Sequence, residues 1–165
     1  MTRFALCLLL LVSVACSSHE VPAEYRPLEQ IKERLGVIGS KTAISTIGRT
    51  AWVADLDAWL KRNQPGSPMY RAILRHEQEH ARRQLAMGTA KWLKRYLSDK
   101  AFMWAEEQIG WYWQITELQR LRQRVYPEGV ARILSGKTYK GMVSYDDALK
   151  WVRDVLGGRW TPPTE

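Results

Sequence analysis

Residues 67–88 read SPMYRAILRHEQEHARRQLAMG, and this segment has the pattern of a long helix. Ser67 followed by Pro68 is typical of a helix start, because a serine side chain can accept a hydrogen bond from the first turn and proline fits the first helical position. Gly88 is typical of a helix end. The segment therefore predicts a helix of about 20 residues between these two ends.

The predicted helix has two different faces. The inward face consists mainly of apolar residues, and it contains Ile73, Leu74, His76, Glu77, His80, Ala81, Gln84, Leu85 and Met87. The outward face is charged or polar, and it contains Arg71, Arg75, Gln78, Glu79, Arg82 and Arg83. Two histidines and one glutamate are therefore expected to point into the protein.

The inward residues His76, Glu77 and His80 form the motif HExxH. Side chains four residues apart on a helix have Cβ atoms about 5–6 Å apart, so both imidazoles can bind one Zn²⁺ at about 2.0–2.1 Å. Glu77 lies close to such a metal and suits a general base acting on a metal-bound water. The alternative is a charged amphipathic helix whose histidine pair only forms hydrogen bonds in the core.

This motif resembles that of the zincin metallopeptidases. In the metzincin branch, the motif continues with a glycine and a third histidine, but Arg83 and Ala86 stand at those positions here. The resemblance is therefore to the gluzincin branch, which implies a carboxylate as the third metal ligand. Glu79 departs from the family, which usually has uncharged residues there, although the helical pattern places Glu79 on the outward face.

The third ligand is expected on a second long helix, predicted over residues 100–126. This helix contains the segment AEEQIGW at residues 105–111. The resemblance implies a ligand glutamate with a small residue one turn later, and Glu107 with Gly110 matches that spacing. Glu106 is the alternative, because it shares a face with apolar residues of the same helix. Either glutamate could instead be a solvated carboxylate on the flank of the helix.

A tyrosine is the remaining element that the resemblance implies, since the family often uses a downstream histidine or tyrosine to stabilise the oxyanion. The chain has no downstream histidine. Its candidate tyrosines are Tyr112, Tyr126, Tyr139 and Tyr145, and the sequence does not rank them.

Short strands are expected before the motif helix. Stretches rich in Val, Ile, Thr and small residues occupy positions 37–38, 43–47 and 51–54, with glycine between them, and predict two or three short strands. A short helix is predicted over residues 28–35, and a short helix or strand exit over residues 55–62.

The remainder of the chain has a helical pattern. Pro127-Glu128-Gly129 predicts an interruption followed by a short turn, and Ser144 with Asp147 resembles a capping box before a last helix over 145–156. The expected fold class is α+β: a mostly helical, zincin-like domain with a small N-terminal β-hairpin or sheet packed on the HExxH helix.

The N-terminus resembles that of bacterial lipoproteins. Residues 4–14 are apolar except for Ser13. This segment is too short to span a bilayer, but it suits a signal peptide. The segment SVAC at 13–16 resembles a lipobox, which implies lipidation of Cys16, although Ser13 stands where the family usually has Leu. The alternative is an ordinary signal peptide that is cut near Ala15 and leaves Cys16 unmodified. The expected organisation is a signal peptide over 1–15, a tether over 16–27, one domain over 28–160 and a loose tail over 161–165.

Composition supports a single globular domain. The chain has 165 residues, of which 45% are hydrophobic and 25% charged, and this excludes a disordered or collagen-like protein. Its two cysteines are Cys7, inside the signal peptide, and Cys16, so the mature chain is expected to have no disulfide. The net charge is +8. The simplest interpretation of this charge is a solvated basic surface; in an exported protein, the partners that it favours are anionic lipids or cell-wall polymers rather than nucleic acid.

The sequence thus predicts a zinc-dependent hydrolase, most simply a peptidase, held by an acyl chain such as palmitate on Cys16. Its substrate would be a peptide or protein of the bacterial cell envelope, and its membrane the outer membrane, facing the periplasm. The alternative is a non-catalytic envelope lipoprotein, with a structural metal or a degenerate peptidase fold used for binding. A third possibility is a helical packing module without a metal.

Overall fold

The computed structural model describes residues 17–33 and 44–164. The predicted signal peptide over 1–15, the lipidation site at Cys16 and the predicted strand at 37–38 lie outside the described residues. The fold is α+β and mostly helical, with six α-helices and a four-stranded sheet in the described part of the chain, which confirms the expected class.

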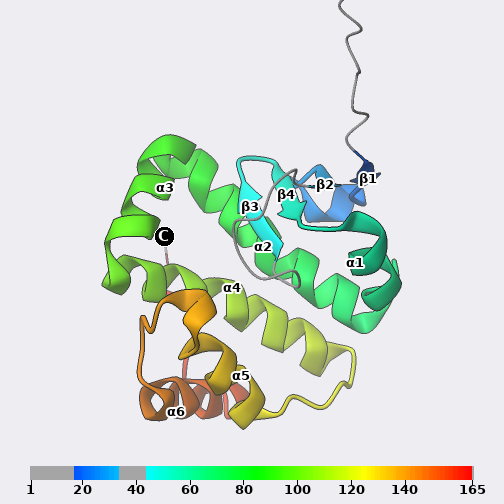
Figure 1. Cartoon of the computed structure of the whole chain (residues 1–165). Coiled ribbons are helices and arrows are strands. Elements are labelled where there is room, and N and C mark those ends of the chain that lie inside the picture. Colours follow the sequence, from blue (N-terminus) through cyan, green and yellow to red (C-terminus); the bar gives the residue numbers. More distant parts are fainter. Residues whose placement is uncertain (1–16, 34–43, 165) are drawn as a thin grey trace, which may run out of the picture.

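Two long helices form the centre of the fold: α2 (Pro68–Met87) and α4 (Lys100–Arg120), which pack against each other (Figure 1). Helix α2 has the predicted bounds. The Ser67 side chain accepts a hydrogen bond from the Tyr70 amide, and Gly88 ends the helix with a φ of 89° that favours glycine. Helix α3 (Thr89–Ser98) connects α2 to α4.

Helix α4 begins at the predicted residue but ends six residues before the predicted residue 126. Its side-chain cap is Asp99, which accepts a hydrogen bond from the amide of Phe102. After the helix, Arg122 adopts a left-handed conformation with a φ of 57°, and this turns the chain out of the helical path.

The sheet contains β1 (Ser18–Glu20), β2 (Gln30–Glu33), β3 (Ile44–Ile47) and β4 (Thr50–Val53) in the order β1-β2-β4-β3. Strands β3 and β4 form an antiparallel hairpin, whereas β2 and β4 are parallel. Strand β3 contacts α2. The small N-terminal sheet therefore packs on the HExxH helix, as predicted.

Two predictions for the N-terminal part were wrong. The expected tether over 16–27 contains β1, and Val21 and Tyr25 are buried in the core, so the folded domain begins before residue 28. Within the range 28–35, where a helix is expected, residues 30–33 form strand β2 instead, and Ile31 pairs with Ala51 of β4. The spacing of Leu28 and Ile31 fits one face of a helix, but pairing with the distant strand β4 decides the structure.

Three further helices complete the fold: α1 (Leu56–Arg62), α5 (Pro127–Leu134) and α6 (Tyr145–Leu156). Helices α5 and α6 pack on each other and lie on the side of α4 away from α2 (Figure 1). Helix α6 has the predicted bounds. Helix α5 replaces the expected interruption and turn, because Pro127 stands at the first helical position, where proline is favoured.

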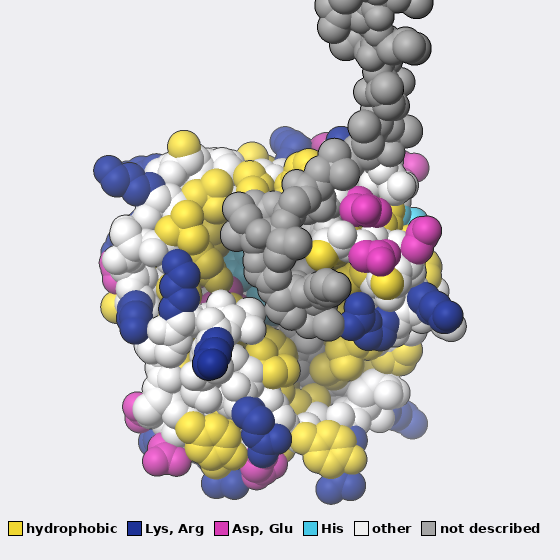
Figure 2. Space-filling model, viewed as in Figure 1, with side chains coloured by type: hydrophobic (Ala, Val, Ile, Leu, Met, Phe, Trp, Pro, Cys, Tyr) yellow, Lys and Arg dark blue, Asp and Glu magenta, His cyan; other side chains and the backbone are white. Residues whose placement is uncertain are grey.

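Most of the buried apolar residues form two clusters. One joins the sheet and α1 to α2, and the other joins α4 to α5 and α6. In the described part of the chain, no helix is long and apolar enough to span a membrane. On the face shown in Figure 2, Lys and Arg side chains are spread over the described surface and lie among Asp and Glu side chains.

Candidate metal centre

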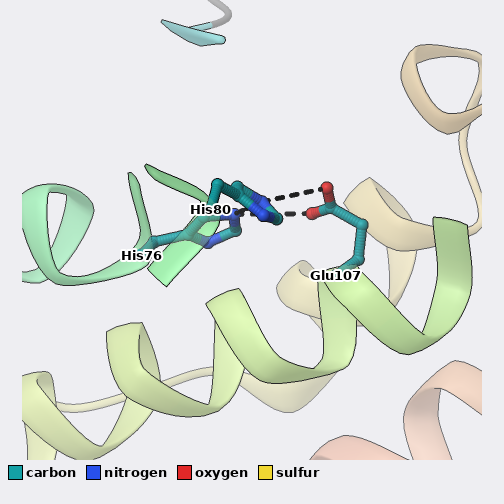
Figure 3. Close-up of side chains that lie close together, drawn as sticks. All are labelled: His76, His80 and Glu107. Atoms are coloured by element: carbon teal, nitrogen blue, oxygen red, sulfur yellow. Dashed lines mark hydrogen bonds and ion pairs between the residues drawn. The ribbon is translucent and has the colours of Figure 1, made fainter. Parts of the chain in front are cut away.

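Three buried side chains meet where α2 crosses α4. His76 and His80 are one turn apart on α2, and Glu107 reaches them from α4 (Figure 3). Their exposed fractions are 5%, 6% and 2%, and their ligand atoms all lie within 4.8 Å of one another. This group could hold a metal ion.

The distances between the ligand atoms fit a single metal. His76 Nε2 lies 2.9 Å from His80 Nε2 and 3.5 Å from Glu107 Oε2, and His80 Nε2 lies 3.3 Å from Glu107 Oε1. Tetrahedral ligands at about 2.0–2.1 Å from a zinc ion are themselves about 3.3 Å apart. Glu107 Oε2 is buried, and it has no hydrogen-bond partner among the described residues. Two imidazoles and one carboxylate are also the donor set of many catalytic zinc sites.

Gly110 allows the two helices to approach at this point. A Cβ atom added to Gly110 would lie 2.7 Å from both Cδ2 and Nε2 of His76, closer than real Cβ contacts. The imidazole therefore packs directly on the backbone of α4. Gly110 is the small residue that the resemblance implies one turn after Glu107.

Neighbouring side chains orient two of the three ligands. His76 Nδ1 lies 3.0 Å from Gln114 Oε1, and because this oxygen can only accept a hydrogen bond, His76 donates from Nδ1. The Nε2 atom of His76 therefore keeps its lone pair, with which it could bind a metal. Tyr96 Oη donates to Glu107 Oε1. His80 Nδ1, in contrast, is buried without a hydrogen-bond partner in the described part of the chain.

The pKa values show strong coupling between His80 and Glu107. Burial alone would lower the pKa of His80, but the charge of Glu107 and a hydrogen bond with it raise this pKa to about 9. Burial alone would raise the pKa of Glu107, but the charge of His80 and a hydrogen bond from His80 hold it below its usual value. Without a metal, the site is therefore stabilised by a proton on its imidazoles.

Glu77, the expected general base, is buried beside the ligands, and Thr46 Oγ1 on β3 donates to its Oε2 at 2.7 Å. Glu106, the alternative third ligand, is also buried, but it points elsewhere. Arg83 donates two hydrogen bonds of 2.7 Å to its two carboxylate oxygens. Among the described residues, Glu107 is therefore the glutamate that the fold places with the histidines.

Among the tyrosines that the sequence does not rank, Tyr139 interacts with Glu107 of the centre. Its hydroxyl accepts a 3.3 Å hydrogen bond from Trp111 Nε1, and burial together with the charge of Glu107 raises its pKa. Tyr126 and Tyr145 are exposed, and Tyr112 packs on Trp113 and Trp160. Tyr96 was not among the candidates, because no sequence signal relates α3 to Glu107.

Aromatic rings surround the two imidazoles. The ring of Trp111 lies 5.6 Å from that of His76, and the ring of Trp92 lies 5.5 Å from that of His80, both edge to face. Trp92 also stacks on Tyr96 at 4.6 Å. These contacts give the ligands an apolar environment, which strengthens electrostatic interactions within the centre.

A second aromatic group is separate from the metal centre. Trp104, Trp151 and Trp160 line a cavity of about 530 Å³ at the surface between α4 and α6. None of the metal-centre residues lines this cavity. On the face shown in Figure 2, a small area of histidine surface is visible beside hydrophobic side chains.

Comparisons of this chain with protein-family models, with curated proteins and with solved structures found no match.

Proposed function

We propose that this protein is a zinc-dependent hydrolase, and specifically a peptidase of the bacterial cell envelope. The observation that carries the proposal is the meeting of His76, His80 and Glu107 beside the buried carboxylate of Glu77. A group of two imidazoles, one ligand carboxylate and a second carboxylate within the same motif has the composition of a hydrolytic zinc site.

When bound, zinc lowers the pKa of a coordinated water to about 7 and polarises a substrate carbonyl. Glu77 takes the proton from the attacking water as the water oxygen bonds to the carbonyl carbon. Glu77 then gives this proton to the amine that leaves when the peptide C–N bond breaks. Tyr139 is the candidate donor to the carbonyl oxygen, because its hydroxyl is kept protonated near Glu107.

A peptide is the favoured substrate because of strand β3. This strand lies at one edge of the sheet formed by the described strands, and its Thr46 contacts Glu77. An extended peptide that paired with this edge would place its backbone carbonyls beside the metal centre. The resemblance of the HExxH motif to zincin peptidases points to the same class of substrate.

The second candidate is a structural metal site, and burial favours it. All three ligands and Glu77 have exposed fractions of 6% or less. A structural zinc has four protein ligands, whereas a catalytic zinc keeps one position for water. X-ray absorption spectroscopy of the zinc-loaded protein distinguishes these coordination shells.

The first experiment measures zinc content and hydrolysis of a fluorogenic peptide library with the same preparations. The wild type should contain about one zinc per chain and hydrolyse peptides. Glu77→Gln should keep the zinc and lose hydrolysis, whereas His76→Ala should lose both. The matched control is Glu79→Gln in the same motif, because Glu79 pairs with Arg82 at 2.9 Å, away from the ligands. An active Glu77→Gln variant would exclude the proposed role of this residue.

The proposed location is the outer membrane, with a lipid on Cys16. The basis is the sequence SVAC at residues 13–16 after an apolar segment. Several acyl chains on one cysteine would hold the protein on the membrane almost irreversibly. Labelled palmitate should be incorporated into the wild type but not into a Cys16→Ser variant, and equal labelling of both would contradict the anchor.

A further inference from the structure

The carboxylate of Glu77 is held by a hydroxyl group from the sheet. The hydrogen bond from Thr46 to Oε2 is short, at 2.7 Å, and the two side chains have exposed fractions of 6% and 4%. In the described part of the chain, no hydrogen bond reaches the other carboxylate oxygen, Oε1. The contact therefore fixes one oxygen and leaves the other available for a proton.

The register of β3 brings Thr46 to this position. Along the strand, Thr46 is buried, whereas its neighbours Ser45 and Ile47 are exposed. Side chains alternate between the two faces of a strand, so a shift of one residue would turn Thr46 away from Glu77. Something must therefore fix the strand against α2.

Gln84 makes this connection. Its Nε2 donates to the backbone oxygen of Thr46 at 2.8 Å, and its Oε1 accepts from the amide of Gly48 at 2.8 Å. The side chain is fully buried, with an exposed fraction of 0%. Gly48 has a φ of 61°, which lets the tight turn between β3 and β4 present its amide to α2.

Gln84 and Glu77 lie on the same face of α2. They are seven residues apart, which is about two helical turns. One helix thus contains both the carboxylate and the amide that fixes the strand above it. Thr46 is thus held at both ends: its backbone oxygen accepts a hydrogen bond from Gln84, and its hydroxyl donates one to Glu77.

We propose that Thr46 and Gln84 are positioning residues for Glu77, an inference that rests on the proposed hydrolase function. Gln84 fixes the β3–β4 turn against α2, and Thr46 holds Oε2 so that Oε1 is the oxygen that takes the proton from water. Neither residue binds the metal. Their effect is to keep a rotatable glutamate side chain in its reactive orientation.

The first test compares Thr46→Val, which has nearly the same shape but no hydroxyl, with Thr46→Ser, which keeps the hydroxyl. With the fluorogenic peptides, Thr46→Val should lower kcat by about tenfold to 100-fold with little change in KM. Its zinc affinity should stay within about threefold of the wild type, because the ligands are untouched. Thr46→Ser should restore most of kcat. The matched control is Ser45→Ala, which removes a hydroxyl from the exposed face of the same strand and should behave as wild type.

The role of Gln84 is tested by a double-mutant cycle. Gln84→Met should lower kcat as Thr46→Val does, because it releases the strand that carries Thr46. If Gln84 acts through Thr46, the double variant should be no slower than the slower single variant. If the fold decrease in kcat of the double variant equals the product of the fold decreases of the two single variants, Gln84 acts independently of Thr46, and its assigned role is overturned.

The outcomes separate this inference from the proposed function. If Glu77→Gln is inactive but Thr46→Val has the kcat of the wild type, positioning by Thr46 is wrong and the hydrolase proposal stands. If the wild type hydrolyses none of the peptides, a crystal structure of zinc-loaded Thr46→Val decides the question without activity. A Glu77 carboxylate turned away from its wild-type position supports the inference, and an unmoved carboxylate overturns it.

Discussion

The two histidines of the metal centre differ in the protons that they hold. His76 donates from Nδ1 to Gln114, so its Nε2 has a lone pair. His80 Nε2 lies 2.9 Å from that nitrogen and 3.3 Å from Glu107 Oε1, and both can accept a hydrogen bond. With a pKa of about 9, His80 is the imidazole that carries the additional proton when no metal is bound.

The stability of the metal-free protein should therefore depend on pH. Folding raises the pKa of His80 from 6.5 to about 9. The contribution of His80 to the free energy of unfolding is therefore complete below pH 6.5 and is lost as the pH rises through 9. The pKa of Glu107 is lowered, so its contribution is lost only in acid, below its usual value of 4.5. Urea unfolding with a chelator should show a loss on the order of 3 kcal/mol between about pH 6.5 and 9.5.

Two controls assign this pH dependence to His80. A His80→Gln variant lacks the titrating group, so its unfolding free energy should change much less over the same range. Saturating zinc should also remove the decline, because a ligand imidazole is neutral and binding releases its proton. A metal-free wild type whose stability is constant from pH 6.5 to 9.5 would contradict the assignment.

At the residue scale, the sequence predicts what depends on local spacing. His76 and His80 are four residues apart on one helix, and Glu107 is three residues before the glycine that allows close packing. The partners of the centre could not be predicted. Gln114 lies 38 residues from His76, and Thr46 lies 31 residues from Glu77, so these contacts depend on how α4 and β3 pack on α2.

At the scale of elements, the crossing of α2 and α4 depends on Gly110. In a Gly110→Ala variant, the added Cβ would lie 2.7 Å from His76 Cδ2 and Nε2, so the imidazole or the helix must move. We expect zinc affinity to fall by at least about tenfold and the free energy of unfolding by about 1–3 kcal/mol. Titration against a chromophoric chelator and urea unfolding measure these two effects.

The matched control for this variant is Gly129→Ala in α5. A Cβ at Gly129 meets its nearest side-chain atom at 3.9 Å, which is an ordinary contact. Because alanine is the better helix former, this variant should be neutral or more stable by up to about 1 kcal/mol, with unchanged zinc affinity. If Gly110→Ala bound zinc as tightly as this control, the close approach of the helices would not be needed for the site.

Elements with local end signals could be predicted, and elements formed by distant pairing could not. The ends of α2 and α6 follow from Ser67 and Ser144 as caps and from the glycines after each helix. Strand β2 has no such signal, because it exists through parallel pairing with β4, about 20 residues later. The sequence predicts an interruption at Pro127, but helix α5 begins there, because proline also starts helices.

At the scale of the whole molecule, the metal centre lies between the two hydrophobic clusters. His76 and His80 belong to α2, whose apolar residues pack with the sheet and α1. Glu107 belongs to α4, whose apolar residues pack with α5 and α6. A bound metal would therefore connect two parts of the fold that also meet through the packing of α2 against α4 and through α3.

Zinc should for this reason stabilise the entire fold and not only its own helix. At a free zinc concentration of 100 times Kd, the expected gain is about 2.7 kcal/mol, which corresponds to a Tm increase of roughly 5–10 °C. Amide hydrogen exchange should slow both in β4 and in α6, because the two clusters then open together. Glu107→Gln should abolish both effects. Zinc-dependent protection confined to α2 would show that the two clusters open independently of the metal centre, and would contradict its role as the link between them.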